Sequence, residues 1–219
     1  MSENKQVTKQ VSPIDALKKN IMNINHFTGN DYTLENERAR LEPLTEKHFP
    51  ELLPIAMKRE IWEFTAADVK DENDFRKYFK QALAERQSGI SYPFAIYDKQ
   101  AGRYAGCTRY GNISMPHKRL EIGWTWYDPS LQRSGINKAS KFLLLTFGFE
   151  TLDLNRIELK TSLLNLKSQG AMLKIGAVKE GILRRHMIAE NGSVRDTIYF
   201  SFIKEDWPSI KATIFAAFI

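Results

Sequence analysis

Apolar residues recur at every second position in some segments of the chain and at helical spacing in others. The changes between these two patterns predict the order of strands and helices. Ala39 and Leu41 alternate with charged residues before a proline, which indicates a short strand. Thr45 follows as a helix cap, and apolar residues then recur at helical spacing through 46–64 and 71–87. The compact part of the chain is therefore expected to begin with a strand and two helices.

The middle of the chain carries strand patterns that are joined by turn residues. Three alternating runs predict a meander of strands over 92–98, 103–113 and 119–128. Next the pattern predicts a strongly apolar helix, a strand, a helix and an antiparallel pair of strands, over 136–149, 156–161, 166–177, 180–188 and 194–203. This order is typical of an α+β fold, in which a mixed, mostly antiparallel sheet has helices on both faces.

The N-terminal part is polar and rich in asparagine, unlike the rest of the chain. We assign residues 1–35 to an N-terminal extension and residues 36–219 to one domain. Ser12, Pro13 and Asp15 resemble a helix start, so a short amphipathic helix is expected over 13–25. We expect it to pack on its own domain rather than on a partner.

The composition fits a globular protein of the cytoplasm. Of 219 residues, 42% are hydrophobic, which is enough to fill the core of one domain. No apolar stretch approaches the ~20 residues that a membrane span needs, and the N-terminus lacks the apolar core of a secretory signal. The single cysteine, Cys107, excludes an intrachain disulfide and is expected as a buried strand thiol.

The charge balance narrows the classes of ligand. A net charge of +6 favours anionic ligands, but the basic residues are scattered, so nucleic acid is not expected as a partner. The four histidines have no metal-binding spacing, and we expect no metal. The tandem Arg184 and Arg185 either bind an acidic acceptor or simply decorate a hairpin, and we favour the second interpretation.

A turn of small and basic residues directly precedes the apolar helix at 136. It contains Gln132, Arg133, Ser134 and Gly135. The first N–H groups of a helix are unpaired and carry partial positive charge, so this turn can accept an anion, typically a phosphate. Taken alone, the same residues also fit an ordinary loop and helix start.

The order of these features resembles the GNAT superfamily of acetyl-CoA-dependent N-acetyltransferases, and most closely its RimJ/RimL-like branch. The family turn reads Gln/Arg-x-x-Gly-x-Gly/Ala, and this chain has QRSGIN, in which Asn137 departs from the usual small residue. The resemblance extends over about residues 36–210 and includes EGILRRHMI, VRDTIYFSFI and EDWPSIK. It implies a cofactor cleft between splayed strands, with the pyrophosphate of acetyl-CoA on the backbone N–H groups of residues 133–137.

Glu121 is the candidate general base. Strict alternation places Leu120, Ile122, Trp124 and Trp126 on one face of their strand and Glu121 on the other. An acceptor amine is mostly protonated at pH 7 and must lose a proton before it attacks, and a partly buried carboxylate beside it can take that proton. The resemblance implies this role, because the RimJ/RimL-like branch has Glu at the matching position; a solvated strand glutamate is the alternative.

Ser168 is the candidate hydrogen-bond donor to the departing sulfur. Many relatives use a tyrosine in this helix, but the matching position here is Met172, whereas the RimJ/RimL-like branch has a serine where Ser168 stands. The alternative is a hydroxyl on the helix surface. The resemblance implies cofactor contacts at the strand end, the turn and the next helix, namely Trp126, Tyr127, Gln132, Arg133, Ser134, Gly135, Ile136, Asn137, Asn165 and Lys174.

The function implied by the resemblance is transfer of acetyl from acetyl-CoA, as cosubstrate, to a primary amine. The acceptor is a protein N-terminus or a small amine such as an amino acid, a polyamine or an amino-sugar, and a homodimer is compatible with the resemblance. The alternative is a non-catalytic acyl-CoA-binding regulator. The presence of both Glu121 and Ser168 favours the enzyme.

Overall fold

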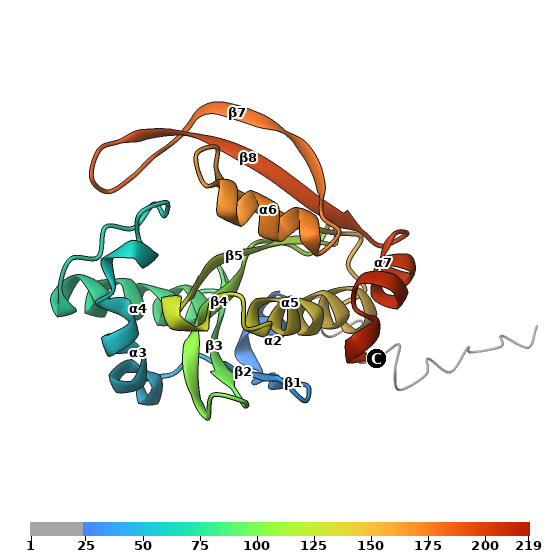
Figure 1. Cartoon of the computed structure of the whole chain (residues 1–219), viewed down its shortest axis with the longest axis horizontal. Helices are drawn as coiled ribbons and strands as arrows, with labels where there is room; N and C mark the ends of the chain where they lie inside the picture. Colours follow the sequence, from blue (N-terminus) through green and yellow to red (C-terminus); the bar gives the residue numbers. More distant parts are fainter. Residues whose placement is uncertain (1–23) are drawn as a thin grey trace, which may run out of the picture.

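The computed structural model describes residues 24–219 as one central sheet with helices on both faces (Figure 1). The strand order is β1-β2-β3-β4-β5-β6-β8-β7, and only β5 and β6 are parallel neighbours. The strands are β1 (Leu34–Glu35), β2 (Ala39–Pro43), β3 (Tyr92–Asp98), β4 (Arg103–Ser114), β5 (Arg119–Tyr127), β6 (Arg156–Ser162), β7 (Val178–Ile188) and β8 (Val194–Ile203). The predicted α+β fold with a mixed, mostly antiparallel sheet is confirmed.

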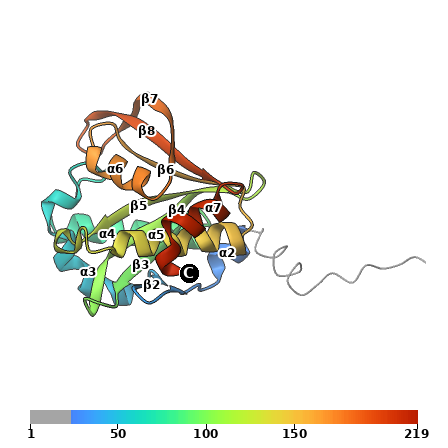
Figure 2. The same ribbon diagram turned by 45° about the vertical axis from the view of Figure 1, so that its right-hand side comes forward.

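The helices lie in two groups. On one face of the sheet α3 (Phe49–Ala56) and α4 (Glu72–Gln87) cover a smaller core, and on the other face α2 (Ile24–Gly29), α5 (Ile136–Thr146) and α7 (Trp207–Ile214) cover the larger one. Strands β7 and β8 arch over α6 (Leu166–Lys174), as Figures 1 and 2 show. Short turns complete the fold: η1 (Glu46–His48), η2 (Arg59–Ile61), η3 (Pro129–Leu131), the π-helical η4 (Phe147–Thr151) and η5 (Ala216–Phe218).

The apolar helix predicted from residue 136 is α5, and it is buried on almost every side. Its buried residues include Ile136, Phe142 and Leu144, and also the polar Ser140 and Lys141. Burial against the sheet fixes the direction of the helix axis. The N-terminus of α5 is therefore held in a constant position at one end of β5.

The continuous helical pattern expected over 46–64 is wrong. The chain there forms η1, the eight-residue α3 and η2 in succession. Pro50 lies in the first turn of α3 and Pro54 lies inside the helix, and a proline removes a backbone donor and crowds the preceding turn. The apolar side chains still reach the core, but through short helical pieces.

Residues 24–35 pack with the domain, although the sequence assigns them to the extension. Phe27 in α2 is fully buried in the larger core, where its ring lies 5.1 Å from that of Tyr92. Strand β1 pairs with β2 through Leu34 and Leu41. The helix expected over 13–25 lies almost entirely outside the described residues.

Candidate functional site

Strands β5 and β6 pair over a short stretch and then separate. Residues 119–121 of β5 are paired with residues 156–158 of β6, and Glu121 with Glu158 is the last pair. Beyond it, β5 stays paired with β4 and β6 stays paired with β8. Beyond this point, residues 122–127 and residues 159–162 form no strand–strand hydrogen bonds with each other. Their backbone N–H and C=O groups that face the opening need other partners.

A β-bulge in β5 lies beside this opening. Trp124 and Thr125 together oppose the single residue Thr108 of β4, and Trp124 has a φ of +48°. The bulge reverses the alternation, so Trp126 packs in the core beneath α3 and α4, while Leu120 packs in the core beneath α5. The expectation that Trp124 and Trp126 share a face with Leu120 is therefore wrong.

Glu121 is buried at the point where the two strands separate. The residue is only 2% exposed to solvent. One carboxylate oxygen, Oε2, accepts hydrogen bonds from Asn112 Nδ2 at 2.6 Å and from Lys160 Nζ at 2.8 Å. No hydrogen bond from residues 24–219 reaches the other oxygen, Oε1. The carboxylate is thus held at Oε2, while Oε1 has no hydrogen-bond partner in the described part of the chain.

Two glycines make room for the side chains at this site. A Cβ atom on Gly123 would lie 2.7 Å from Oε1 of Glu121, and a Cβ atom on Gly111 would lie 2.3 Å from the Trp124 ring. The Trp124 side chain is 40% exposed, and the Lys160 Nζ lies 6.0 Å from its ring centre. The position of Trp124 next to Glu121 therefore depends on small neighbours in both strands.

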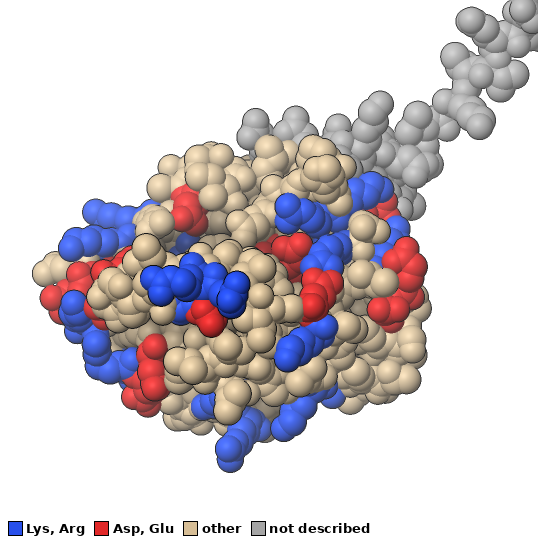
Figure 3. All heavy atoms as spheres, turned by 90° about the horizontal axis from the view of Figure 1, so that it is seen from above, with Lys and Arg blue, Asp and Glu red and all other residues tan. Residues whose placement is uncertain are grey.

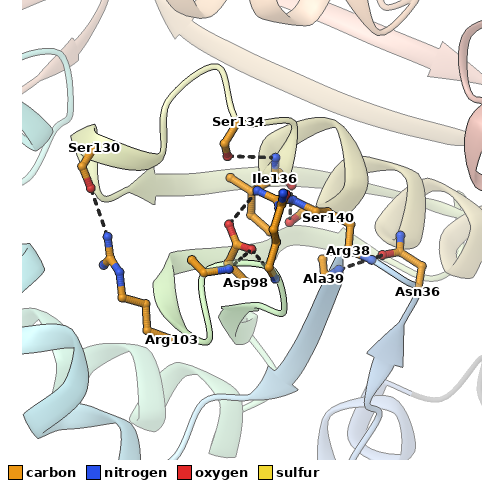
Figure 4. Close-up of polar contacts among 11 residues, drawn as sticks. Asn36, Arg38, Ala39, Asp98, Arg103, Ser130, Ser134, Ile136 and Ser140 are labelled. Atoms are coloured by element: carbon orange, nitrogen blue, oxygen red, sulfur yellow. Dashed lines mark hydrogen bonds and ion pairs between the residues drawn. The ribbon is translucent and has the colours of Figure 1, made fainter.

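The turn before α5 has the backbone shape that a glycine favours. Gly135 is the N-cap of α5 with a φ of +92°, and Arg133 has a φ of +64°. The Ser134 hydroxyl accepts a hydrogen bond from the Ile136 N–H at 3.4 Å, as Figure 4 shows at the start of the helix. Nothing lies within 4 Å of the position that a Cβ would take at Gly135. The space in front of this helix start is open for a ligand.

Basic side chains lie beside this turn, but several are already paired with acids. Arg103 donates to Asp128 at 2.7 Å. It also donates to Ser130 at 3.0 Å, and Arg38 donates to Asp98 at 2.9 Å (Figure 4). Lys167 of α6 contacts Gln132 of the turn. The last contact links the turn to α6 directly.

The expected cofactor residues Trp126 and Tyr127 have their side chains packed inside the protein. The Trp126 ring lies among the aromatic rings beneath α3 and α4, and the Tyr127 ring packs against the larger core. Only their backbone groups are left to face the gap between β5 and β6. Any contact of these two residues with a ligand there would be a backbone contact.

Asn165 and Ser168 lie together at the start of α6. The Asn165 side chain caps the helix, because its Oδ1 accepts from the Ser168 N–H at 3.0 Å. No hydrogen bond from the described residues engages the Ser168 hydroxyl. Met172 packs against the larger core, and the exposed Lys174 ends the helix about 9 Å along its axis from Ser168. The structure therefore groups Asn165 with Ser168 and does not bring Lys174 next to them.

Lys141 is a buried lysine that the sequence analysis missed. It is 5% exposed, and its Nζ donates to Thr125 Oγ1 at 2.9 Å, beneath the bulge of β5. Burial lowers the pKa of Lys141 to about 7. Lys141 directly precedes the apolar run Phe142–Leu145, and this position was the available signal, since lysine is almost never fully buried without a partner.

The tandem arginines lie on the outside of the hairpin. Arg184 and Arg185 are exposed on β7, and the Arg185 N–H donates to Asp196 at 2.6 Å. Lys and Arg side chains are prominent on the face of the molecule seen from above in Figure 3. This placement fits the expectation that the pair decorates the hairpin.

Two further properties of the described chain bear on the site. Across residues 24–219, no helix has the length and apolar character that crossing a membrane requires. The same part of the chain contains no group of three or more His, Cys, Asp or Glu side chains placed to hold a metal ion. Cys107 is buried in β4 as expected, and burial raises the pKa of its thiol to about 12.

Comparison with known sequences finds acetyltransferases. The family described as "Acetyltransferase (GNAT) domain" matches residues 38–178. The chain is 31% identical over 174 residues to the "Putative ribosomal N-acetyltransferase YdaF" of Bacillus subtilis, and the match covers 78% of this chain and 92% of that protein. It is 25% identical to the ribosomal-protein-serine acetyltransferase of Escherichia coli, covering 68% of this chain and 84% of that protein.

Comparison with solved structures finds the same fold. A GCN5-related N-acetyltransferase from Brucella melitensis superposes with a TM-score of 0.78 at 27% identity, over 85% of each chain. The structure of Mycobacterium smegmatis RimJ in complex with CoA-disulfide has a TM-score of 0.70 at 22% identity, over 85% of this chain and 93% of that one. The second likeness is one of fold.

Proposed function

The chain belongs to the GNAT family of N-acetyltransferases, enzymes that use an acyl-CoA, and we propose that it moves the acetyl group of acetyl-CoA to the α-amine of a protein N-terminus. The names of two relatives, one a ribosomal N-acetyltransferase and one a ribosomal-protein-serine acetyltransferase, support a protein acceptor. The amine attacks the thioester directly in this proposal. We propose the cytoplasm as its place of action, in line with the single reduced and buried thiol.

Two features of the chain suit acetyl-CoA as the cosubstrate. The unpaired backbone edge of residues 122–127 offers N–H and C=O groups to the amides of the pantetheine arm. The N–H groups of residues 133–137 at the start of α5 offer partial positive charge to the pyrophosphate. Asn165, Lys174 and Gln132 are proposed as further contacts of the same ligand. The strand edge thus suits the amides of the pantetheine arm, and the helix start suits the pyrophosphate.

Glu121 is proposed as the base. The acceptor arrives mostly as an ammonium group, since an α-amine has a pKa of roughly 8. Oε1 of Glu121 accepts the proton, either directly or through a water, while Asn112 and Lys160 keep Oε2 in place. Supplying an unprotonated amine next to the thioester is the chemical task of this residue.

The remaining steps need hydrogen-bond donors. As the amine nitrogen bonds to the thioester carbon, charge develops on the carbonyl oxygen, and a backbone N–H of the bulged strand β5 is proposed to stabilise it. The carbon–sulfur bond then breaks, and the electron pair leaves with the sulfur of coenzyme A. The Ser168 hydroxyl, which has no partner among residues 24–219, is proposed to donate a hydrogen bond to that sulfur.

The single observation that carries the proposal is the position of Glu121 at the last parallel pair of β5 and β6. A buried carboxylate is costly unless the protein uses it or pairs it, and this one has one paired and one unpaired oxygen. It stands where the opening between the strands begins. A carboxylate in that place serves an amine acceptor better than it serves a regulator that only binds acyl-CoA.

An amine panel with detection of free thiol tests the function. The panel contains peptides with different first residues, free amino acids, polyamines and an amino-sugar, each with acetyl-CoA. We expect thiol release with peptides, together with a mass increase at the peptide α-amine. Thiol release only with small amines would mean that the acceptor is a small amine and not a protein. Tight acetyl-CoA binding with no release for any amine would favour the non-catalytic regulator.

A further inference from the structure

Arg195 on β8 is a half-buried arginine that has no acidic partner among residues 24–219. Its Nη1 donates to the Phe64 carbonyl at 2.9 Å, and its Nη2 lies 3.3 Å from the sulfur of Met187. Its Nε is buried and makes no hydrogen bond within that part of the chain. By contrast, the buried Arg109 pairs with the carboxylate of Glu85. A half-buried cation that forms no ion pair is costly, and a bound anion would reduce that cost.

Thr197 is a second unpaired polar group on the same face of β8. Its residue is fully buried, and its Oγ1 makes no hydrogen bond within the described chain. Arg195 and Thr197 are two residues apart on a regular strand, so their side chains point to the same side. An unpaired guanidinium N–H and an unpaired hydroxyl thus stand next to each other.

This face leads to the candidate base. Thr197 is paired with Ser162 of β6, and Tyr199 is paired with Lys160, so these side chains share one face of the sheet. The Lys160 Nζ donates to Glu121 at 2.8 Å. A continuous polar strip therefore runs from Arg195 through Thr197 and Lys160 to Glu121. The intervening residue Ile198 points to the opposite face, into the larger core.

Charge links the two ends of this strip. Burial lowers the pKa of Arg195, and attraction to the carboxylate of Glu121 and to Tyr199 acts in the opposite direction. Glu121 is thus near enough to act on Arg195 electrostatically, although the two form no ion pair within 4.0 Å. An acceptor with an amine at Glu121 would bring its neighbouring groups close to Arg195.

A segment between α3 and α4 closes over the Arg195 end of the strip. Besides the bond from Arg195 to Phe64, the Glu190 N–H donates to Ala66 at 3.0 Å, and the Asp68 N–H donates to the Glu190 carboxylate at 2.9 Å. In Figure 1 this segment rises from the side of α3 and α4 toward the tip of the β7–β8 hairpin. Such cover limits water and strengthens charge interactions beneath it.

We propose that Arg195 and Thr197 bind a carboxylate of the acceptor, so that the enzyme prefers amines that carry an acidic group close to the reacting nitrogen. In a protein acceptor this group is an Asp or Glu side chain near the N-terminus. The unpaired Nε–H of the guanidinium offers a charged hydrogen bond to a carboxylate, and the Thr197 hydroxyl offers a second donor. This inference rests on the proposed N-terminal acetylation.

The test compares two peptides that differ only by Glu or Gln at the second position. For the wild type we expect kcat/KM to be about 10-fold to 100-fold higher with the Glu peptide, the worth of charged hydrogen bonds. Arg195→Met should remove most of this preference, and Thr197→Val should reduce it. Arg184→Met, which removes an exposed charge from the neighbouring strand, should leave it unchanged. The preference is the ratio of kcat/KM for the Glu peptide to kcat/KM for the Gln peptide, both measured on the same protein sample. A partly unfolded variant therefore still gives a valid ratio.

A binding measurement supplies a readout that is independent of turnover. Titration of each peptide into the protein with coenzyme A should show tighter binding of the Glu peptide to wild type but not to Arg195→Met. Equal kcat/KM and equal affinity of wild type for the two peptides would overturn the inference while leaving N-terminal acetylation intact. Acetylation of free glutamate but of no peptide would support the Arg195 site and refute the protein acceptor.

Discussion

The Glu121 carboxylate and the Lys160 ammonium lie 2.8 Å apart, at the place where β5 and β6 stop pairing. The side chains of both residues are largely withdrawn from water, at 3% and 15% exposure. An ion pair in that setting depends on both partners, because removing one leaves an uncompensated buried charge. Lys160 therefore fixes the candidate base in position and balances its charge.

Replacing Lys160 by methionine should destabilise the protein by about 3 kcal/mol, through the loss of the partner of a buried carboxylate. The double variant Lys160→Met, Glu121→Gln should lose less free energy of unfolding than the two single variants lose together, because it contains neither charge. Urea unfolding of the four proteins measures this coupling. Additive losses would mean that the two side chains do not stabilise each other.

Gly123→Ala should lower kcat while leaving the affinity for acetyl-CoA unchanged. The new methyl group would lie 2.7 Å from Glu121 Oε1, and the carboxylate, as the end of a flexible side chain, would move rather than the backbone. A displacement of the base by a fraction of an ångström should cost about 10-fold to 100-fold in kcat. Steady-state kinetics measures this split between kcat and KM.

Gly181→Ala is the matched control for that variant. Gly181 lies on β7, and a Cβ there would meet nothing within 4 Å. It should keep the wild-type kcat. A Gly123→Ala enzyme that is as fast as wild type would show that the room beside Oε1 is not needed for catalysis.

Gly135→Glu should abolish acetyl-CoA binding, because it places bulk and negative charge at the proposed pyrophosphate site. Any side chain at a φ of +92° is strained, so Gly135→Asn, which tolerates this conformation better, separates strain from charge. The Asn variant should still bind. Titration calorimetry with acetyl-CoA measures both, and wild-type affinity in the Glu variant would refute the assignment of the turn.

The buried Lys141 should make stability depend on pH. Its pKa is about 7 in the folded protein and about 10.4 in an unfolded chain, so the unfolded state binds more protons between these values. The free energy of unfolding should therefore rise with pH from about 7 to about 10, by at most about 1.4 kcal/mol per pH unit from this group. Lys141→Met should remove that contribution.

Urea unfolding at several pH values checks this, with Lys138→Met on the same helix as the control. The control should keep the wild-type dependence on pH. The same slope in wild type and Lys141→Met would mean that Lys141 is charged in the folded protein.

The sequence was sufficient for the strands and for most helices around the site, but not for the geometry within it. Alternation of apolar residues predicted the strand that is β5, yet strict alternation put Trp124 on the wrong face, because a bulge is a local change of register that leaves the apolar pattern looking regular. The continuous helix over 46–64 failed for a related reason: the apolar positions were correct, but Pro54 and the short turns divided it.

The partners of the candidate residues could not be found in the sequence. Lys160 follows Glu121 by 39 positions, and it reaches the carboxylate because β6 lies parallel to β5. Arg195 donates to the carbonyl of Phe64, which lies 131 positions earlier in the chain. Contacts of this kind depend on strand order and register, which motifs such as QRSGIN do not encode.

Replacement of Glu121 by glutamine, followed over pH, tests the central claim most directly. The amide keeps the shape of the side chain and loses its basicity, and kcat/KM should fall about 10²-fold to 10⁴-fold. Glu158→Gln, the same change at the residue paired with Glu121, is the control and should stay close to wild type.

The decisive measurement is the ratio of kcat/KM between wild type and Glu121→Gln from pH 6.5 to pH 9.5, with a peptide whose α-amine has a pKa of roughly 8. If Glu121 is the base, the ratio shrinks as pH rises, because free amine then forms without help. A ratio that stays constant over this range would show that Glu121 only positions the acceptor, and would contradict its role as the base.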